Sequence, residues 1–151
     1  MVVIGSDHGG LQLKAVLSEA LRLRGLDLRD MGTDSDDSVD YPDFAEKVAG
    51  AVSRGEAACG VLICGTGIGM SIVANKFPGV RAALVTDDFM AQMAKEHNNA
   101  NVLVLGGRVL DAPTACRLVG LWLDTAFEGG RHQRRLDKIA ELEADVRAGR
   151  I

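Results

Sequence analysis

The sequence predicts an α/β fold: one doubly wound, Rossmann-like parallel sheet of five strands, with helices on both faces and a further helix at the C-terminus. Short, continuous apolar runs alternate five times with stretches in which apolar residues have helical spacing. Apolar runs without alternating polar residues are typical of strands that helices cover on both sides. Many of the 18 glycines stand at the ends of these runs, where the chain has to turn.

The first half of the chain supplies two strands and two helices. Residues 2–4 form the first predicted strand, and apolar residues at helical spacing follow until a glycine stops them. Residues 26–31 alternate apolar and polar side chains, as a second strand does, and lead into an acidic loop over residues 34–40. Pro42 opens the next helix, which ends at Gly55.

The second half supplies the other three strands. Residues 60–64 are the strongest strand signal, and a glycine-rich loop and an apolar helix ending near residue 77 follow them. Residues 80–85 and 101–105 are the fourth and fifth strands, with a helix capped by Asp87 between them. A long helix covers residues 113–127. We expect the last helix to pack on a partner subunit through its apolar residues, Leu136, Ile139, Leu142 and Val146.

Composition limits the classes of function. The length suits one domain, residues 1–151, and no repeat or linker divides the chain. The net charge of −4 argues against nucleic-acid binding, which usually needs a basic surface. No apolar run approaches the ~20 residues that span a bilayer, and no secretory leader is recognisable. Three cysteines do not make a disulfide framework, so we expect a cytoplasmic protein.

Conspicuous polar residues follow the predicted strands. Asp7 and His8 come after the first strand, Cys64 ends the third, and Arg108 follows the fifth. Ligands of parallel sheets bind beyond the carboxyl ends of the strands, so we expect these residues to meet at one edge of the sheet. His97 is an exception, because it precedes the fifth strand.

Cys64 stands between a strand and a helix, and the glycine-rich loop over residues 65–69 follows it. A thiol there lies near the helix dipole and backbone amides, which favour its thiolate form. The plain alternative is a small buried apolar residue, as most free cysteines are. Successive amides of the glycine loop are also suited to hold an anion.

Other families with a comparable loop do not fit the spacing. A dinucleotide-binding loop follows the first strand as G-x-G-x-x-G, whereas this one follows the third as G-x-G-x-G, with Met70 in the last place. A cysteine phosphatase has an arginine where Met70 stands, and a response-regulator receiver has an aspartate where Cys64 stands.

Some candidate residues have ordinary explanations. Asp7 could simply cap a helix. Arg131 and Arg135 lie four residues apart, and on their own they indicate a solvated basic helix face. The start of a helix is nevertheless an unfavourable place for cations, and a bound anion would remove that conflict.

Seven short segments together resemble the family of ribose-5-phosphate isomerase B and the galactose-6-phosphate isomerases. They occur in order along almost the whole chain: GSDHGG at 5–10, DYP at 40–42, CGTGIGMS at 64–71, ANK at 74–76, EHNNAN at 96–101, GR at 107–108 and GGRHQRR at 129–135. The resemblance implies an aldose–ketose isomerase of sugar phosphates that needs no metal or organic cofactor. It also implies a homodimer, or a tetramer, whose active sites are each built from two chains.

The resemblance also implies residue roles. One branch of the family has a cysteine base at the position of Cys64, and the other has a glutamate at the position of Met70. Methionine cannot accept a proton, so this chain resembles the cysteine branch. Thr66 and His97 resemble the groups that open the sugar ring, with His97 reaching in from the partner subunit.

The remaining roles concern the rest of the substrate. Asp7 resembles a ligand of the sugar hydroxyls. The resemblance implies that the phosphate group is held by His8, Arg131 and Arg135, with Arg108 of the partner subunit. It also implies that Tyr41 and Asn98 line the pocket. The enediolate is held by the backbone amides of an anion hole, Gly65, Gly67, Ile68, Gly69 and Met70.

Ribose 5-phosphate and ribulose 5-phosphate are the substrate pair that the resemblance favours. Allose 6-phosphate, galactose 6-phosphate and four-carbon sugar phosphates stay open, because the acidic loop over residues 34–40 has no clear counterpart in the family. A non-catalytic sugar-phosphate or nucleotide sensor would keep the arginines and the glycine loop. The joint presence of Cys64, Thr66 and His97 argues against a sensor.

Overall fold

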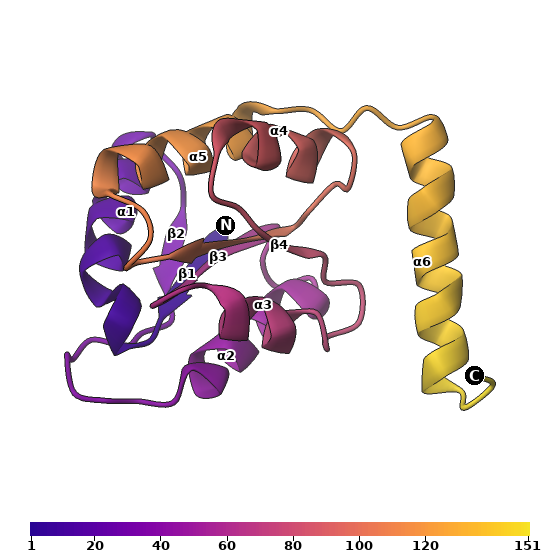
Figure 1. Cartoon of the computed structure of the whole chain (residues 1–151), viewed down its shortest axis with the longest axis horizontal. Helices are drawn as coiled ribbons and strands as arrows, with labels where there is room; N and C mark the ends of the chain where they lie inside the picture. Colours follow the sequence, from indigo (N-terminus) through magenta and orange to yellow (C-terminus); the bar gives the residue numbers. More distant parts are fainter.

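A single parallel sheet forms the centre of the computed structural model, which describes all residues from 1 to 151 (Figure 1). The order of its strands is β2-β1-β3-β5-β4. Their bounds are Val2–Ser6 for β1, Leu28–Asp30 for β2, Cys59–Cys64 for β3, Ala82–Leu84 for β4 and Val102–Gly106 for β5. In the register of the central strands, Ile63 lies beside Ser6 and Cys64 beside Gly106. The carboxyl ends of β1, β3 and β5 therefore lie together.

Helices cover both faces of the sheet, which confirms the doubly wound fold (Figure 1). One face carries α1 (Leu11–Leu23), α4 (Asp88–Glu96) and α5 (Ala112–Asp124), and the other carries α2 (Tyr41–Ser53) and α3 (Ile68–Ala74). Alternate residues of a strand point to opposite faces. Ile4 accordingly belongs to the aliphatic cluster that contains Leu17 and Leu103, and Val3 belongs to the one that contains Val48.

Side-chain caps start two of the helices at the expected kind of residue. Asp87 accepts a hydrogen bond from the backbone N–H of Met90 at 2.8 Å and so begins α4. Asp111 likewise accepts a hydrogen bond from the backbone N–H of Thr114 at 2.8 Å and begins α5. Pro42 lies in the first turn of α2, where its missing N–H costs no hydrogen bond.

The edge strands and two helix ends differ from the sequence prediction. The strands expected over residues 26–31 and 80–85 are shorter, because each has one neighbour only. The side chain of Asn75 bonds both the N–H and the C=O of Ala82 at 2.9 Å, and it ends α3 before residue 77. Helix α5 ends at Asp124 because Thr125 is extended.

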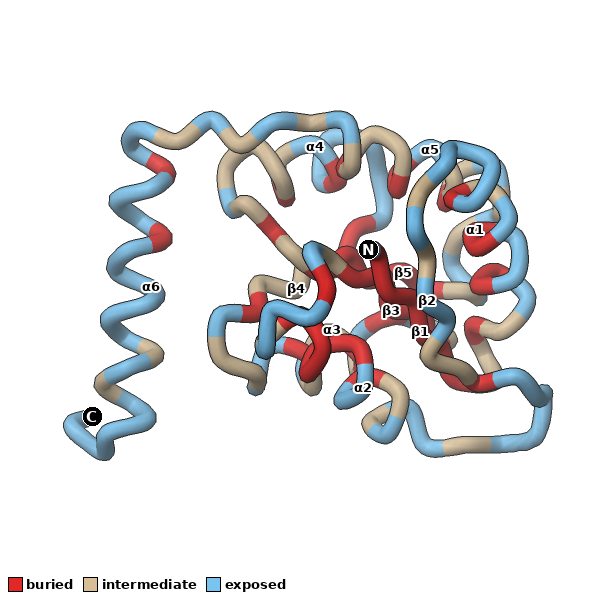
Figure 2. Tube along the Cα trace, turned by 180° about the vertical axis from the view of Figure 1, so that it is seen from behind, coloured by how far each residue is buried: buried red, intermediate tan, exposed pale blue.

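The last helix, α6 (Arg131–Arg147), lies apart from the body of the molecule (Figures 1 and 2). Only His132 and Leu136 of this helix are buried. Three of its apolar side chains remain about half exposed: Ile139 at 50%, Leu142 at 52% and Val146 at 57%. A cavity of about 690 Å³ separates it from the loop before β4. None of the helices is both long enough and apolar enough to cross a membrane.

Candidate active site

The carboxyl end of β3 is the centre of the candidate site. The neighbouring strands' ends are bonded to it: the N–H of Asp7 donates to the carbonyl of Ile63 at 3.2 Å, and the N–H of Gly107 donates to that of Cys64 at 2.7 Å. The N–H of Arg108 donates to the carbonyl of Gly65 at 2.9 Å. These backbone bonds bring the residues after β1, β3 and β5 to one edge, as predicted from the strand pattern.

The Cys64 side chain is buried, with 5% of its surface exposed. Its Sγ atom accepts a hydrogen bond from the backbone N–H of Gly67 at 3.1 Å. The bond holds the sulfur at the carboxyl end of β3, next to the glycine loop. Burial raises the pKa of the other two thiols, Cys59 at the start of β3 and Cys116 on α5. Cys64 is therefore the thiol that the fold places at the predicted edge of the sheet.

The loop after Cys64 depends on glycine at two positions. Gly67 has a φ of +81°, and a Cβ atom there would lie 2.5 Å from the Leu84 side chain. A Cβ atom at Gly69 would lie 2.6 Å from the ring of Tyr41, so this ring packs directly on the loop. A Cβ atom at Gly65 would lie 3.5 Å from the side chain of Arg108. Tyr41 and Arg108 therefore flank the glycine loop.

Two amides of the predicted anion hole already have partners. The N–H of Gly67 is bonded to the Cys64 sulfur, and the N–H of Ile68 donates to Oγ1 of Thr66 at 3.3 Å. The Gly67 amide is therefore engaged by the Cys64 side chain in this structure. Thr66 is exposed beside it.

Asp7 and His8 follow β1 and have defined partners. Asp7 is buried, and its Oδ1 accepts the N–H of Gly10 at 3.2 Å, which starts the short 3₁₀ helix η1 (His8–Gly10). The capping role expected for Asp7 is thus present. His8 accepts the N–H of Val39 at its Nδ1 atom, at 3.2 Å. In the neutral form, its proton is therefore on Nε2.

A cavity of about 690 Å³ lies next to these residues. His8, Gly107 and Arg108 line it together with residues 34–36 of the acidic loop. His8 and Arg108 of one chain thus share one cavity. The expectation was that Arg108 meets His8 from a partner subunit, whereas here the two line the same cavity within one chain.

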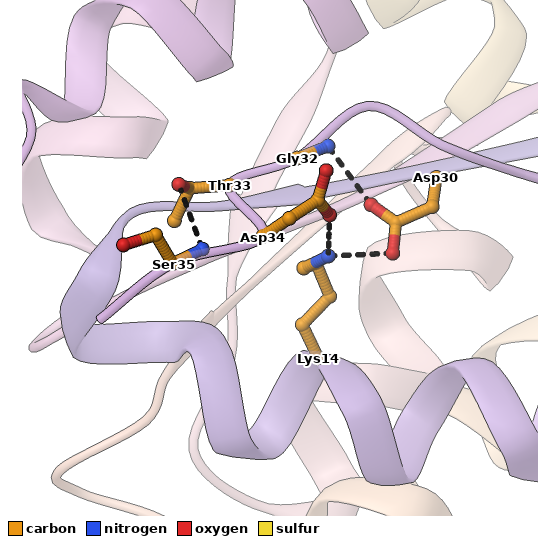
Figure 3. A network of polar contacts seen from close by, with 6 residues as sticks. All are labelled: Lys14, Asp30, Gly32, Thr33, Asp34 and Ser35. Carbon is orange, nitrogen blue, oxygen red and sulfur yellow. Dashed lines mark hydrogen bonds and ion pairs between the residues drawn. The ribbon is translucent and has the colours of Figure 1, made fainter. Parts of the chain in front are cut away.

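Lys14 holds the acidic loop in place and was not predicted as a site residue (Figure 3). Its side chain is 4% exposed, and its Nζ atom lies 2.5 Å from Asp30 Oδ2 and 3.7 Å from Asp34 Oδ1. Asp30 also accepts the N–H of Gly32 at 2.8 Å. The loop is therefore fixed by Lys14 at its start and by His8 near its end. A lysine next to the apolar stripe of α1 is the signal that could have revealed it.

The other predicted residues lie elsewhere in the chain. His97 and Asn98 follow α4, and Arg131 and Arg135 begin α6. This segment leads into the amino end of β5, where Asn101 accepts the N–H of Gly60 at 2.9 Å. Cys64 lies at the opposite, carboxyl end of the sheet. One chain therefore does not bring these four residues to Cys64.

Comparisons with known proteins identify the family of this chain. The family model described as Ribose/Galactose Isomerase matches residues 2–139. Ribose-5-phosphate isomerase B of Escherichia coli is 44% identical over 94% of this chain and 95% of its own length. A putative sugar phosphate isomerase of Bacillus subtilis is 48% identical over 94% of this chain and 96% of its own.

Solved structures give the same result. Ribose-5-phosphate isomerase B of Clostridium thermocellum superposes with a TM-score of 0.94 at 51% identity, covering 96% of this chain and 98% of that one. The enzyme of Mycoplasma genitalium, solved with bound ribulose-5-phosphate, has a TM-score of 0.92 at 44% identity, covering 95% and 96%. The chain therefore belongs to the ribose/galactose isomerase family, and it is an aldose–ketose isomerase of sugar phosphates.

Proposed function

We propose that this isomerase interconverts ribose 5-phosphate and ribulose 5-phosphate through a cis-enediolate, with Cys64 as the general base. The observation that carries the proposal is the Cys64 sulfur at the end of β3, bonded at 3.1 Å to the amide of Gly67. The names of the relatives support the substrate pair, since one of them was solved with ribulose-5-phosphate.

The reaction moves protons only. The Cys64 thiolate takes the proton from C2 of the open aldose, and the electron pair of that C–H bond forms the C1–C2 double bond while the carbonyl oxygen O1 takes up the negative charge of the enediolate. The hydroxyl proton on O2 passes to O1, the Cys64 thiol returns its proton to C1, and a carbonyl forms at C2. A positioned base contributes about 10²–10⁴ in rate. Because no electron leaves the sugar, the reaction needs no redox cofactor, and the family resemblance implies no metal or other organic cofactor.

The enediolate carries negative charge close to the loop at residues 65–70. Backbone amides aimed at a developing oxyanion contribute about 10²–10³ in rate each. In our proposal, the amides of Gly65, Gly69 and Met70 hold this charge. The amides of Gly67 and Ile68 join them only after leaving their bonds to the Cys64 sulfur and to Oγ1 of Thr66. Asp7 holds the sugar hydroxyls beside the loop, and Tyr41 lines the pocket.

Ring opening requires the residues that one chain keeps apart. Ribose 5-phosphate enters as a closed ring, and the partner's His97 opens it with Thr66. Asn98 of the partner subunit lines the pocket. We therefore propose a homodimer with two shared sites, and a dimer is the smallest assembly that completes them. The half-exposed apolar side chains of α6 support a partner contact.

The phosphate group is held from both chains in this proposal. His8 and Arg108 line one cavity, and Arg131 and Arg135 of the partner subunit close it. Arginines at the start of α6 face the unfavourable end of the helix dipole until a phosphate neutralises them. We also propose that the enzyme acts in the cytoplasm, where a reducing environment keeps the Cys64 thiol free.

Deuterium exchange tests the reaction, the base and the sugar together. In D₂O, the wild-type enzyme should introduce solvent deuterium at the carbon beside the carbonyl of ribose 5-phosphate and ribulose 5-phosphate. Cys64→Ala should abolish this exchange, whereas the matched variant Cys116→Ala should retain it. Exchange with allose 6-phosphate, galactose 6-phosphate or a four-carbon sugar phosphate alone would replace the proposed substrate. No exchange with any sugar phosphate would favour a sensor.

A further inference from the structure

Three side chains meet where α4 ends and α6 begins, namely His97, Glu128 and His132. The imidazole rings of His97 and His132 stack, with centroids 4.0 Å apart and 11° between their planes. Nε2 of His132 lies 2.8 Å from Oε2 of Glu128, and Nε2 of His97 lies 4.0 Å from the same oxygen. The residue His132 is only 2% exposed, which is unusual for a side chain on this otherwise solvated helix.

Backbone contacts fix both sides of this cluster. The N–H of Glu128 donates to the carbonyl of Glu96 at 3.0 Å, so the linker after α5 is attached to the last residue of α4. Behind His97, the guanidinium of Arg81 donates to the carbonyls of Asn98 and Asn99 at 2.9–3.2 Å. The turn that carries His97 and the linker that carries Glu128 are therefore held independently of the two imidazole rings.

We propose that Glu128 and His132 are positioning residues that orient the His97 ring for opening of the sugar ring, an inference that rests on the proposed function. Nε2 of His132 lies 2.8 Å from Oε2 of Glu128, and this polar contact holds the plane of the His132 ring. Stacking then imposes that plane on His97. Without it, the 35% exposed side chain of His97 would be free to occupy several rotamers.

The same side chains resemble the ligand set of a zinc site, but their geometry argues against one. An imidazole binds zinc in its own plane at about 2.0–2.1 Å. The rings of His97 and His132 are stacked and nearly parallel, with centroids 4.0 Å apart, so one ion cannot lie in the planes of both rings. The cationic Nε of Arg131 also lies 3.4 Å from Nε2 of His132, where it would repel a metal.

Only one of the two substrates needs its ring opened, so the two substrates distinguish ring opening by His97 from proton transfer by Cys64. Ribose 5-phosphate closes to a ring through O4, and the ring has to open before C2 can lose its proton. Ribulose 5-phosphate carries its phosphate on O5, so it cannot close to a five-membered ring and stays open. Exchange of its C1 proton with solvent therefore needs Cys64 but not His97. Net interconversion with the closed aldose needs both.

The experiment compares these two readouts in the full-length enzyme. His132→Ala and Glu128→Ala should lower kcat for ribose 5-phosphate about tenfold to a hundredfold, the size expected when a reacting group loses its alignment. The C1 exchange of ribulose 5-phosphate and the KM values should stay near those of the wild type. His97→Ala should give the same pattern more strongly. Lys138→Ala, an exposed position on α6, is the matched control and should resemble the wild type.

Conservative variants test the orienting contacts themselves. Glu128→Gln keeps a polar oxygen within reach of Nε2 of His132, and His132→Phe keeps a flat ring for stacking. Both should retain more ring-opening activity than the corresponding alanine variants. If Glu128→Gln loses as much as Glu128→Ala, the glutamate acts through its charge, and the positioning role is wrong.

Other results would also contradict the inference. In His132→Ala, proton exchange could fall and KM could rise for both substrates together. That result would mean that His132 only anchors α6. Loss of activity with a chelator, restored by zinc, would assign the cluster to a metal. If the His132 and Glu128 variants behaved like the wild type, the positioning role would be wrong, but the proposed function would stand. Failure of the proposed function would look different, because wild-type exchange would then be absent or would persist in Cys64→Ala.

Discussion

Cys64 is buried and accepts a hydrogen bond at its sulfur, whereas Cys59 and Cys116 are only partly buried and accept none. The strand–glycine pattern predicted where Cys64 stands, but the bond from Gly67 could not be predicted from it. That bond requires a φ of +81° at Gly67, and this value depends on how Leu84 and Leu105 pack around the loop. At the scale of a residue, the sequence indicates the chemical group, and tertiary packing determines its reactivity.

Alkylation with a small reagent such as iodoacetamide should distinguish the three thiols. A raised pKa means less thiolate at a given pH, and burial raises the pKa of Cys59 and Cys116. Around pH 7 to 8, Cys64 should therefore react first, and phosphate or ribose 5-phosphate should slow its reaction. Cys59 and Cys116 should gain reactivity only above about pH 8.5, the ordinary range of a thiol. Peptide mass mapping against pH measures this, and prior labelling of Cys116 would contradict it.

Substitution of Gly67 tests the loop that holds Cys64, the proposed base. In Gly67→Ala, the new Cβ would lie 2.5 Å from the Leu84 side chain and 3.1 Å from the Leu105 carbonyl, in addition to the strain of the positive φ. We expect a loss of about 1–3 kcal/mol in unfolding free energy from the backbone strain alone, more from the overlap, and very low activity.

Gly25→Ala is the control for this substitution. Gly25 has a φ of +75° but no neighbouring atom within 4 Å of the new Cβ. It should therefore show the strain without the overlap and keep its activity. Urea unfolding of both variants measures the difference, and equal stability with equal activity would argue against a requirement for glycine beside Cys64.

At the scale of elements, apolar runs predicted the buried strands well, and tertiary contacts decided the rest. Strands β1, β3 and β5 lie within two residues of the predicted ranges, because each is buried on both faces. The acidic loop over residues 34–40 could not be predicted. Its conformation depends on Lys14 and His8, which lie 16 or more residues earlier than their partners in the sequence.

The Lys14 contact with this loop should control phosphate binding more than chemistry. Lys14→Met keeps the apolar stem but removes the ion pairs with Asp30 and Asp34. Because both carboxylates reach solvent, the effect on stability should be modest, about 1 kcal/mol. The freed loop should raise KM for ribose 5-phosphate severalfold with little change in kcat, since the Val39 amide would no longer hold His8.

Lys14→Arg is the conservative counterpart of this variant. It keeps the positive charge near Asp30 and should stay closer to the wild-type KM. Steady-state kinetics of both variants measure the effect. A fall in kcat at unchanged KM would show that the loop acts on the reacting carbons and not on the phosphate end.

At the scale of the whole molecule, the candidate site is divided between opposite ends of the sheet. The order of residues along the chain predicted this division, because His97 precedes the fifth strand whereas Cys64 ends the third. The stacking of His97 on His132 was not predictable, because it depends on the path of the linker from α5 to α6. The detached position of α6, with a half-exposed apolar face, is consistent with the proposed partner contact (Figure 2).

Subunit complementation tests the shared site most directly. The Cys64→Ala and His97→Ala proteins should each be nearly inactive in converting ribose 5-phosphate to ribulose 5-phosphate. A mixed dimer regains one site, which has an intact Cys64 and the partner's intact His97. After full exchange of equal amounts, half of the dimers are mixed, so activity should return to about a quarter of the wild-type value. Continued inactivity, with mixed dimers demonstrated by mass spectrometry, would contradict an active site built from two chains.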